Sequence, residues 1–113
     1  MTDDQAGAVA AVRRLPPAAL AGLREAFAAE VSDRLPRLRD AAASGDPDDL
    51  GTALRDAHSL GSSAVVVGEP DVSRAARSVE QLLLEWQAGS PPELSRLRDR
   101  VDALATRLEG WRP

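Results

Sequence analysis

The chain has 113 residues, 43% of them apolar and 28% charged, which fits one globular domain with a single hydrophobic core. Its net charge of −4 argues against a nucleic-acid partner, although all 14 basic residues are arginine, and the lack of cysteine excludes disulfides and thiolate chemistry. No apolar run approaches the roughly 18 residues of a membrane span and the acidic N-terminus lacks a signal peptide, so we expect a cytoplasmic protein.

Helices are favoured along the chain, because only 3% of residues are aromatic and alanine and leucine dominate the apolar set. Residues 3–14 have a thin apolar stripe and predict a short helix or arm that ends at residues 15–17, Leu-Pro-Pro. From residue 18 to about residue 44, apolar side chains recur every three or four positions, as on one face of a helix. Pro36 removes a backbone hydrogen bond inside this segment and is predicted to kink the helix or divide it.

Two more helices are predicted in the middle of the chain. Asp46 is a good N-cap, and the helix that it begins is expected to run to Val67 and stop at Gly68. Pro70 suits the first position of the next helix, whose apolar stripe lasts until residues 89–92, Gly-Ser-Pro-Pro. These two helices should therefore form an antiparallel hairpin with a very short turn.

A last helix is predicted over residues 94–111, where apolar side chains alternate strictly by three and four. Ser90 and Glu93 have the spacing of a capping box in front of it. Four long apolar stripes with short connections fold most simply as an up-down-up-down antiparallel four-helix bundle. We therefore expect an all-α, single-domain chain, 1–113, with the bundle over 17–111 and the short helix or arm over 1–16 at one end.

The reactive side chains exclude most kinds of enzymatic site. The chain has neither cysteine nor tyrosine and no nucleophile-elbow pattern, and it has too few histidines for a zinc site or for a carboxylate-bridged metal site in a bundle. No glycine-rich phosphate loop is present, so no nucleotide site is visible. We expect a protein that is not an enzyme and that has no resident metal or cofactor.

The chemistry is expected at His58, the only histidine, which lies beside the apolar face of its helix at the boundary with solvent. Its predicted outward neighbours are Arg55 and the small residues Gly61, Ser62 and Ser63. Gly61 is alternatively a small residue that lets two helices pack closely. Small neighbours leave an imidazole open to a large partner, and a neutral imidazole is a good nucleophile toward a phosphoryl donor. Without this context, a lone histidine on a helix surface would simply be a surface residue.

Glu80 is predicted to lie level with His58 on the next helix. The short turn is centred on residue 69, eleven residues after His58 and eleven before Glu80. A carboxylate there would accept a hydrogen bond from one ring nitrogen, fix the tautomer and leave the other nitrogen free to attack, whereas a solvated glutamate at the helix edge is the alternative. By the same count, Arg77 lies level with Gly61.

Residues 54–85 resemble the signature of histidine-containing phosphotransfer (HPt) domains, including the first domain of chemotaxis histidine kinases. The family pattern is His-x-Leu-Lys-Gly-Ser/Gly-Ala/Ser, then a glycine ten residues after the histidine, an apolar residue fourteen after it and an apolar-Glu pair near twenty-two. The matching residues are His58, Leu60, Ser63, Ala64, Gly68, Val72 and Val79-Glu80. The resemblance implies a phosphoacceptor at His58 and docking to a response-regulator receiver domain or a hybrid histidine kinase, with transfer to or from a receiver aspartate.

Two positions depart from the family pattern, because Gly61 replaces the lysine and Ser62 replaces the following glycine. We expect Arg77, or alternatively Arg55, to supply the missing charge and Ser62 a hydroxyl donor, since arginine matches the geometry of phosphate oxygens. The missing lysine also favours a second hypothesis, an adaptor that binds a receiver or kinase without phosphotransfer. A plain helical scaffold is a third. We expect a monomer that stands alone.

Overall fold

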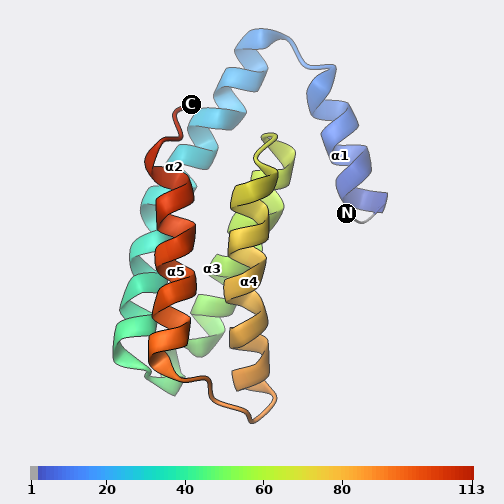
Figure 1. Ribbon diagram of the computed structural model, residues 1–113. Coiled ribbons are helices and arrows are strands. Elements are labelled where there is room, and N and C mark those ends of the chain that lie inside the picture. The colour runs from blue at the N-terminus through green and yellow to red at the C-terminus, as the bar shows by residue number, and fades with distance from the viewer. Residues whose placement is uncertain (1–2) are drawn as a thin grey trace.

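The computed structural model describes residues 3–113, the side chains of residues 3–5, 8 and 13 excepted. Its elements are α1 (Asp3–Arg13), α2 (Pro17–Ser44), the 3-10 turn η1 (Pro47–Asp49), α3 (Leu50–Val66), α4 (Pro70–Gln87) and α5 (Leu94–Glu109). Helices α2 to α5 run alternately down and up in an antiparallel bundle (Figure 1), and the residues described include no strand. The predicted all-α four-helix bundle with a short extra N-terminal helix is confirmed.

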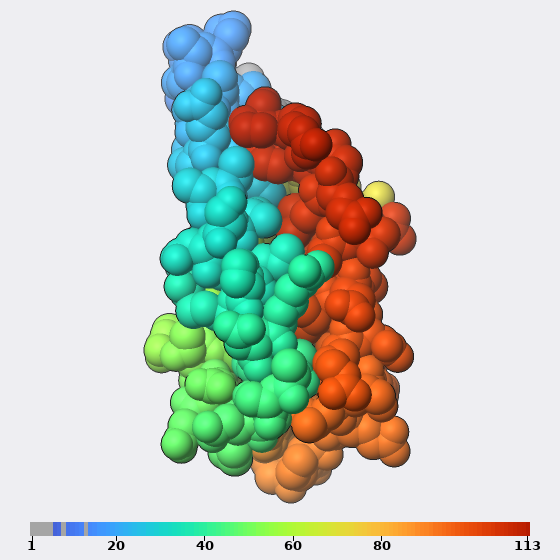
Figure 2. Space-filling view, turned by 90° about the vertical axis from the view of Figure 1, so that its left-hand side faces the viewer, coloured from blue at the N-terminus to red at the C-terminus, as the bar shows by residue number. Residues whose placement is uncertain are grey.

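Each helix of the bundle packs against two neighbours, so that α2 contacts α3 and α5, and α4 contacts the same two helices. Figure 2 shows α2 and α5 side by side, with the N-terminal part of α2 rising beyond the end of α5. The largest side chains of the core come from all four helices and include Phe27, Leu60, Leu82, Leu97 and Leu104. This arrangement leaves the outer edge of the α3–α4 seam free of any other bundle helix.

The turn between α3 and α4 is as short as the sequence predicts. Gly68 has a φ of +80°, which glycine adopts without a steric penalty. The N–H of Glu69 then donates to the carbonyl of Ala64 at 2.8 Å, which ends α3, and Pro70 begins α4. The two helices are therefore held antiparallel by a turn of very few residues.

Helix α2 continues through Pro36 as one helix, so the predicted possibility of a division is wrong. The proline ring is exposed and costs the helix only the bond that its missing N–H would have made. Leu38 is buried and Leu35 packs against the core, so apolar contacts hold the backbone on both sides of the proline.

The predicted capping box before α5 is also wrong. Helix α5 begins at Leu94, and Glu93 is its N-cap, without a side-chain capping bond. The N–H of Ser90 instead donates to the carbonyl of Glu85 at 2.9 Å, next to Gly89 at a φ of +99°. Ser90 therefore belongs to the end of α4, and it lies too far from α5 to cap it.

Helix α1 lies outside the bundle, against α3 (Figure 1). Val9 and Val12 of α1 line a hollow of about 510 Å³ together with Leu20 and residues 65–68 at the end of α3. Among the residues that the structure describes, no helix has both the length and the apolar character needed to cross a membrane.

Candidate functional site

His58 lies in the middle of α3, and its side chain is 70% exposed. Its Nδ1 is 2.7 Å from Oε2 of Glu80 on α4, and the Glu80 side chain is only 20% exposed. Because an ionised carboxylate can only accept, Nδ1 carries the proton and donates it. In the neutral ring, Nε2 then keeps its lone pair, and the predicted placement of Glu80 at hydrogen-bonding distance from an accessible His58 is confirmed.

The sequence produces this contact through local geometry. The short turn after α3 places residues at equal distance from it at the same height, and both partners directly follow a buried apolar residue, Ala57 or Val79. Each side chain therefore leaves its helix at the edge of the seam rather than within it. The imidazole and the carboxylate meet across that edge.

Gly61 and Arg77 also meet in the α3–α4 seam. A Cβ atom built on Gly61 would lie 3.5 Å from Cγ of Arg77 and 3.6 Å from Cβ of Ala76, so the stem of Arg77 passes beside Gly61, as the count from the turn predicts. The expectation that Gly61 is an open, outward neighbour of His58 is wrong, because Gly61 is buried, and the alternative of a small residue for close helix packing holds instead. It packs against α4, and its carbonyl accepts a 2.8 Å hydrogen bond from Oγ of Ser73.

Arg55 is directed away from His58. Its guanidinium donates to Oγ1 of Thr52 at 3.2 Å, one turn nearer the N-terminus of α3. His58 lies one turn in the opposite direction along the same helix. This contact holds the Arg55 guanidinium away from the imidazole, whereas the stem of Arg77 lies in the α3–α4 seam.

Ser62 lies one turn after His58 on nearly the same face of α3, and Ser63 lies further round the helix, toward α2. Both line a hollow of about 250 Å³ between α2 and α3, whose apolar surface includes Leu23, Phe27 and Val66. The α3–α4 seam therefore collects the imidazole, its carboxylate partner, Gly61 and Arg77, whereas the two serines line the hollow beside α2.

A group of charged residues to which the sequence interpretation gave no role lies beside the site. Asp56 is only 1% exposed and bonds to Arg34 and Arg37 of α2. Burial would raise the pKa of this carboxyl, but the hydrogen bonds from Arg37 and Arg34 outweigh burial and hold the pKa below its ordinary value. The sequence does carry a signal for this buried group. It is an acidic residue within an apolar stripe, together with two arginines three positions apart on the preceding helix.

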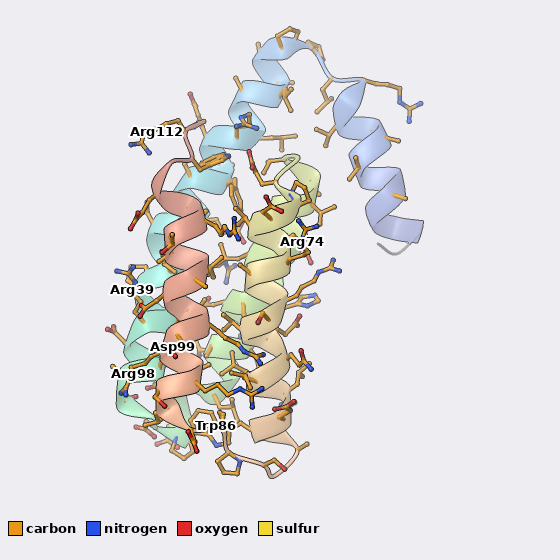
Figure 3. All side chains as sticks on the ribbon, in the orientation of Figure 1. Arg39, Arg74, Trp86, Arg98, Asp99 and Arg112 are labelled. Carbon is orange, nitrogen blue, oxygen red and sulfur yellow. The ribbon has the colours of Figure 1, made fainter. Side chains whose placement is uncertain are left out.

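Another hollow, of about 240 Å³, lies between α2 and α5. Arg39 and Arg98, both labelled in Figure 3, flank it, and Asp102 places a carboxylate in the same lining. Because it involves α2 and α5, this hollow is separate from the α3–α4 seam and is no part of the site at His58.

Comparison with models of known protein families places the chain. A family model described as an Hpt domain matches residues 22–111, which cover the bundle from the second turn of α2 onward and leave out α1. The chain has no significant match among curated proteins or among solved structures.

Proposed function

Because this chain belongs to the family of Hpt domains, the histidine-containing phosphotransfer domains, we propose that it is a phosphorelay intermediate that carries a phosphoryl group on His58. Domains of this family take part in two-component signalling as phosphocarriers rather than as classical enzymes, and they interact with receiver domains and kinases. The proposed donor or acceptor is the aspartate of a response-regulator receiver domain, either a separate protein or part of a hybrid histidine kinase.

The proposed transfer is a nucleophilic displacement at phosphorus. The Nε2 lone pair of neutral His58 attacks the phosphorus of an aspartyl phosphate, so that an N–P bond forms while the P–O bond to the aspartate breaks. The electron pair of the broken bond leaves with the aspartate carboxylate. The phosphorylated ring gains a positive charge and keeps its Nδ1 proton, which remains hydrogen-bonded to the Glu80 carboxylate.

The observation that supports this function most strongly is the contrast between the two members of the His58–Glu80 pair. The imidazole is largely exposed, as a group that must reach the active site of another protein needs to be, while the carboxylate that holds it is mostly shielded. A shielded carboxylate stabilises the positive charge on the ring more strongly than a solvated one, because water screens it less.

A second candidate function is a non-phosphorylated adaptor of the same fold, which would bind a receiver or kinase without transfer. Gly61 favours it, because the family pattern has a lysine at this position. The adaptor would need the surface around His58 but not the lone pair of Nε2. The two functions therefore differ in one measurable property, the covalent modification of the imidazole.

Incubation with a receiver domain phosphorylated by acetyl phosphate tests the proposal. We expect the phosphoryl group to move to this chain and to form a modification that is labile in acid and stable in base, as a phosphoramidate bond is. Intact-protein mass and phosphorus NMR would detect it. Receivers that bind the chain but never transfer phosphate to it would instead support the adaptor.

Glu80→Ala should slow phosphotransfer by about two- to tenfold, because a hydrogen bond to a ring that is 70% exposed is weakened by solvent and contributes about 0.5–1.5 kcal/mol. The variant should stay folded, since Glu80 lies at the edge of the seam. Stopped-flow or quenched-flow transfer from a phosphorylated receiver would measure the rate. Glu85→Ala, which removes an exposed carboxylate from the same helix, is the matched control and should leave the rate unchanged. Equal rates in the two variants would rule out a role for Glu80.

A further inference from the structure

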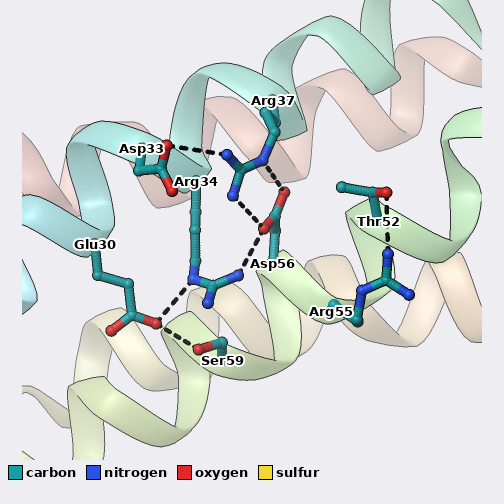
Figure 4. A network of polar contacts seen from close by, with 8 residues as sticks. All are labelled: Glu30, Asp33, Arg34, Arg37, Thr52, Arg55, Asp56 and Ser59. Atoms are coloured by element: carbon teal, nitrogen blue, oxygen red, sulfur yellow. Dashed lines mark hydrogen bonds and ion pairs between the residues drawn. The ribbon is translucent and has the colours of Figure 1, made fainter.

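Helix α3 is tied to α2 by a set of directed polar contacts that involve Asp56 and Ser59 (Figure 4). The Asp56 carboxylate of α3 accepts three hydrogen bonds. Arg34 donates to Oδ1 at 2.8 Å, while Arg37 donates from Nε to Oδ2 and from its terminal nitrogen to Oδ1, both at 2.9 Å. Arg37 thus binds the carboxylate with a two-pronged, planar contact, which tolerates little rotation.

A second tie lies one turn further along α3. Oγ of Ser59 donates to Oε1 of Glu30, and the same oxygen accepts a 3.0 Å bond from Nε of Arg34. Asp56 and Ser59 are thus joined to α2 through one connected network. They stand on either side of His58 in the sequence, so the turn that carries the imidazole is anchored on its α2 side.

Burial of Asp56 requires a reason beyond stability. Removing a carboxylate and its partners from water is costly, and a buried ion pair is on balance a weak source of stability compared with apolar packing. Such pairs are better known for selecting one relative arrangement of helices. We call this network the clamp; it consists of Asp56, Ser59, Glu30, Arg34 and Arg37. The clamp is therefore expected to select one arrangement of α3.

Apolar packing alone gives α3 few large side chains to fix its rotation. Its fully buried residues are mainly small, with Leu60 the one large apolar side chain among Ala53, Asp56, Ala57, Leu60, Gly61 and Ala64. The other two leucines of α3, Leu50 and Leu54, pack against the core but are only partly buried. A smooth surface of alanine and glycine can turn against its neighbours more easily than interlocking leucines can. Directed hydrogen bonds from α2 compensate for this lack of interlocking.

Rotation of α3 would matter directly at His58. Side chains extend to about 5–6 Å from a helix axis, so a 20° turn moves their ends by about 2 Å. A movement of that size would separate Nδ1 of His58 from the Glu80 carboxylate, which is 2.7 Å away. The clamp on the α2 side and the imidazole on the α4 side are therefore linked through the rotation of one helix.

We propose that Asp56 is a positioning residue for His58, which acts through Arg34 and Arg37 to hold α3 at the rotation that joins the imidazole to Glu80. The effect of Asp56 on the rate of phosphotransfer rests on the proposed function, whereas its effect on the tautomer and orientation of the imidazole does not. Asp56 touches neither the phosphoryl group nor the ring. It sets the tautomer and direction of the ring from the opposite side of the helix.

Asp56→Asn tests this, since asparagine keeps the volume but loses the charge and faces Arg37 with an amide. Nitrogen NMR of the His58 ring gives the ratio of the Nδ1–H to the Nε2–H tautomer. We expect Nδ1–H to dominate in the wild type and the ratio to fall about two- to tenfold in Asp56→Asn, toward the value of Glu80→Ala. A ratio unchanged from the wild type would overturn the proposal.

Two further variants separate positioning from stability. Val101→Ala removes buried methyl groups from α5, far from the clamp in the chain, and should lower the melting temperature while leaving the tautomer ratio unchanged. If Asp56→Asn does not fold, Arg37→Gln takes its place, because the Arg37 side chain is 41% exposed and its loss leaves Arg34 on the carboxylate. An equal fall of the ratio in Val101→Ala would show that general loosening, not the clamp, governs the ring.

Transfer from a receiver phosphorylated by acetyl phosphate provides the functional readout. We expect Asp56→Asn to be slower by about two- to tenfold, and no slower than Glu80→Ala, because its effect is transmitted through the same His58–Glu80 contact. A wild-type chain that accepts no phosphate would refute the proposed function, and the tautomer ratio would still decide the positioning role. A normal transfer rate in a folded Asp56→Asn variant would refute the role in transfer.

Discussion

His58→Gln is expected to abolish phosphorylation of this chain and to leave its helical content unchanged. No other histidine is present, and the glutamine amide has no ring nitrogen with an available lone pair. Glutamine forms helices at least as well as histidine, and its amide N–H can still donate to Glu80. Labelling from a phosphorylated receiver, together with far-ultraviolet circular dichroism, measures both parts of the expectation.

The matched control is Arg55→Gln, which places the same new side chain one turn earlier on the exposed part of α3. It should be phosphorylated like the wild type. Label that persists in His58→Gln would mean that the phosphoacceptor is another residue. The central proposal would then fail, even though the family assignment would stand.

Arg77→Ala should lower the rate of phosphotransfer by about ten- to a hundredfold. The stem of Arg77 lies beside Gly61, where the family pattern would begin a lysine side chain. A charge-assisted contact to phosphate contributes about 1.5–3 kcal/mol, and its loss has an effect of this size on a rate. The single-turnover rate of transfer from a phosphorylated receiver is the measurement.

A lysine at position 61 should restore part of the lost rate. A Cβ atom on Gly61 would make only ordinary van der Waals contacts, and Arg77→Ala removes the stem that would lie nearest to a longer side chain. We therefore expect Gly61→Lys in the Arg77→Ala background to be faster than Arg77→Ala alone. Gly61→Ala in the same background controls for the gain in helix propensity, about 1 kcal/mol, without adding charge.

Arg55→Ala is the control for position, because its guanidinium is bonded to Thr52 and points away from the imidazole. We expect its transfer rate to equal that of the wild type. A slow Arg55→Ala with a normal Arg77→Ala would mean that the cation comes from the same helix as His58. If both variants are normal, the receiver supplies its own cation and Arg77 has no role.

The hairpin that carries the site could be worked out from the sequence because its geometry depends on local rules. Gly68 and Pro70 mark where one helix ends and the next begins. Because the turn is so short, residues at equal distances from it along the chain lie at the same level along the bundle axis. For this reason the sequence alone places Glu80 opposite His58 and Arg77 opposite Gly61, as the structure does.

Local signals misled where two elements competed for one residue. Ser90 has the spacing of an N-cap, but its N–H is used by the C-terminal turn of α4. Gly61 looked like an opening beside the imidazole, but the close approach of α4 buries it. In both cases the residue does occupy a structurally special position, as its type indicates. Contacts with the neighbouring helix determine what that position is.

The sequence by itself determined the four long helices, the short turn between α3 and α4, and the level at which His58 meets Glu80, since periodicity, glycines and prolines act over a few residues. Only the tertiary structure decided that Asp56 is buried against Arg34 and Arg37, which are 22 and 19 residues away in the chain. The rotation of a helix about its axis depends on all its neighbours at once. For a helix whose buried residues are mostly small, no local pattern specifies that rotation.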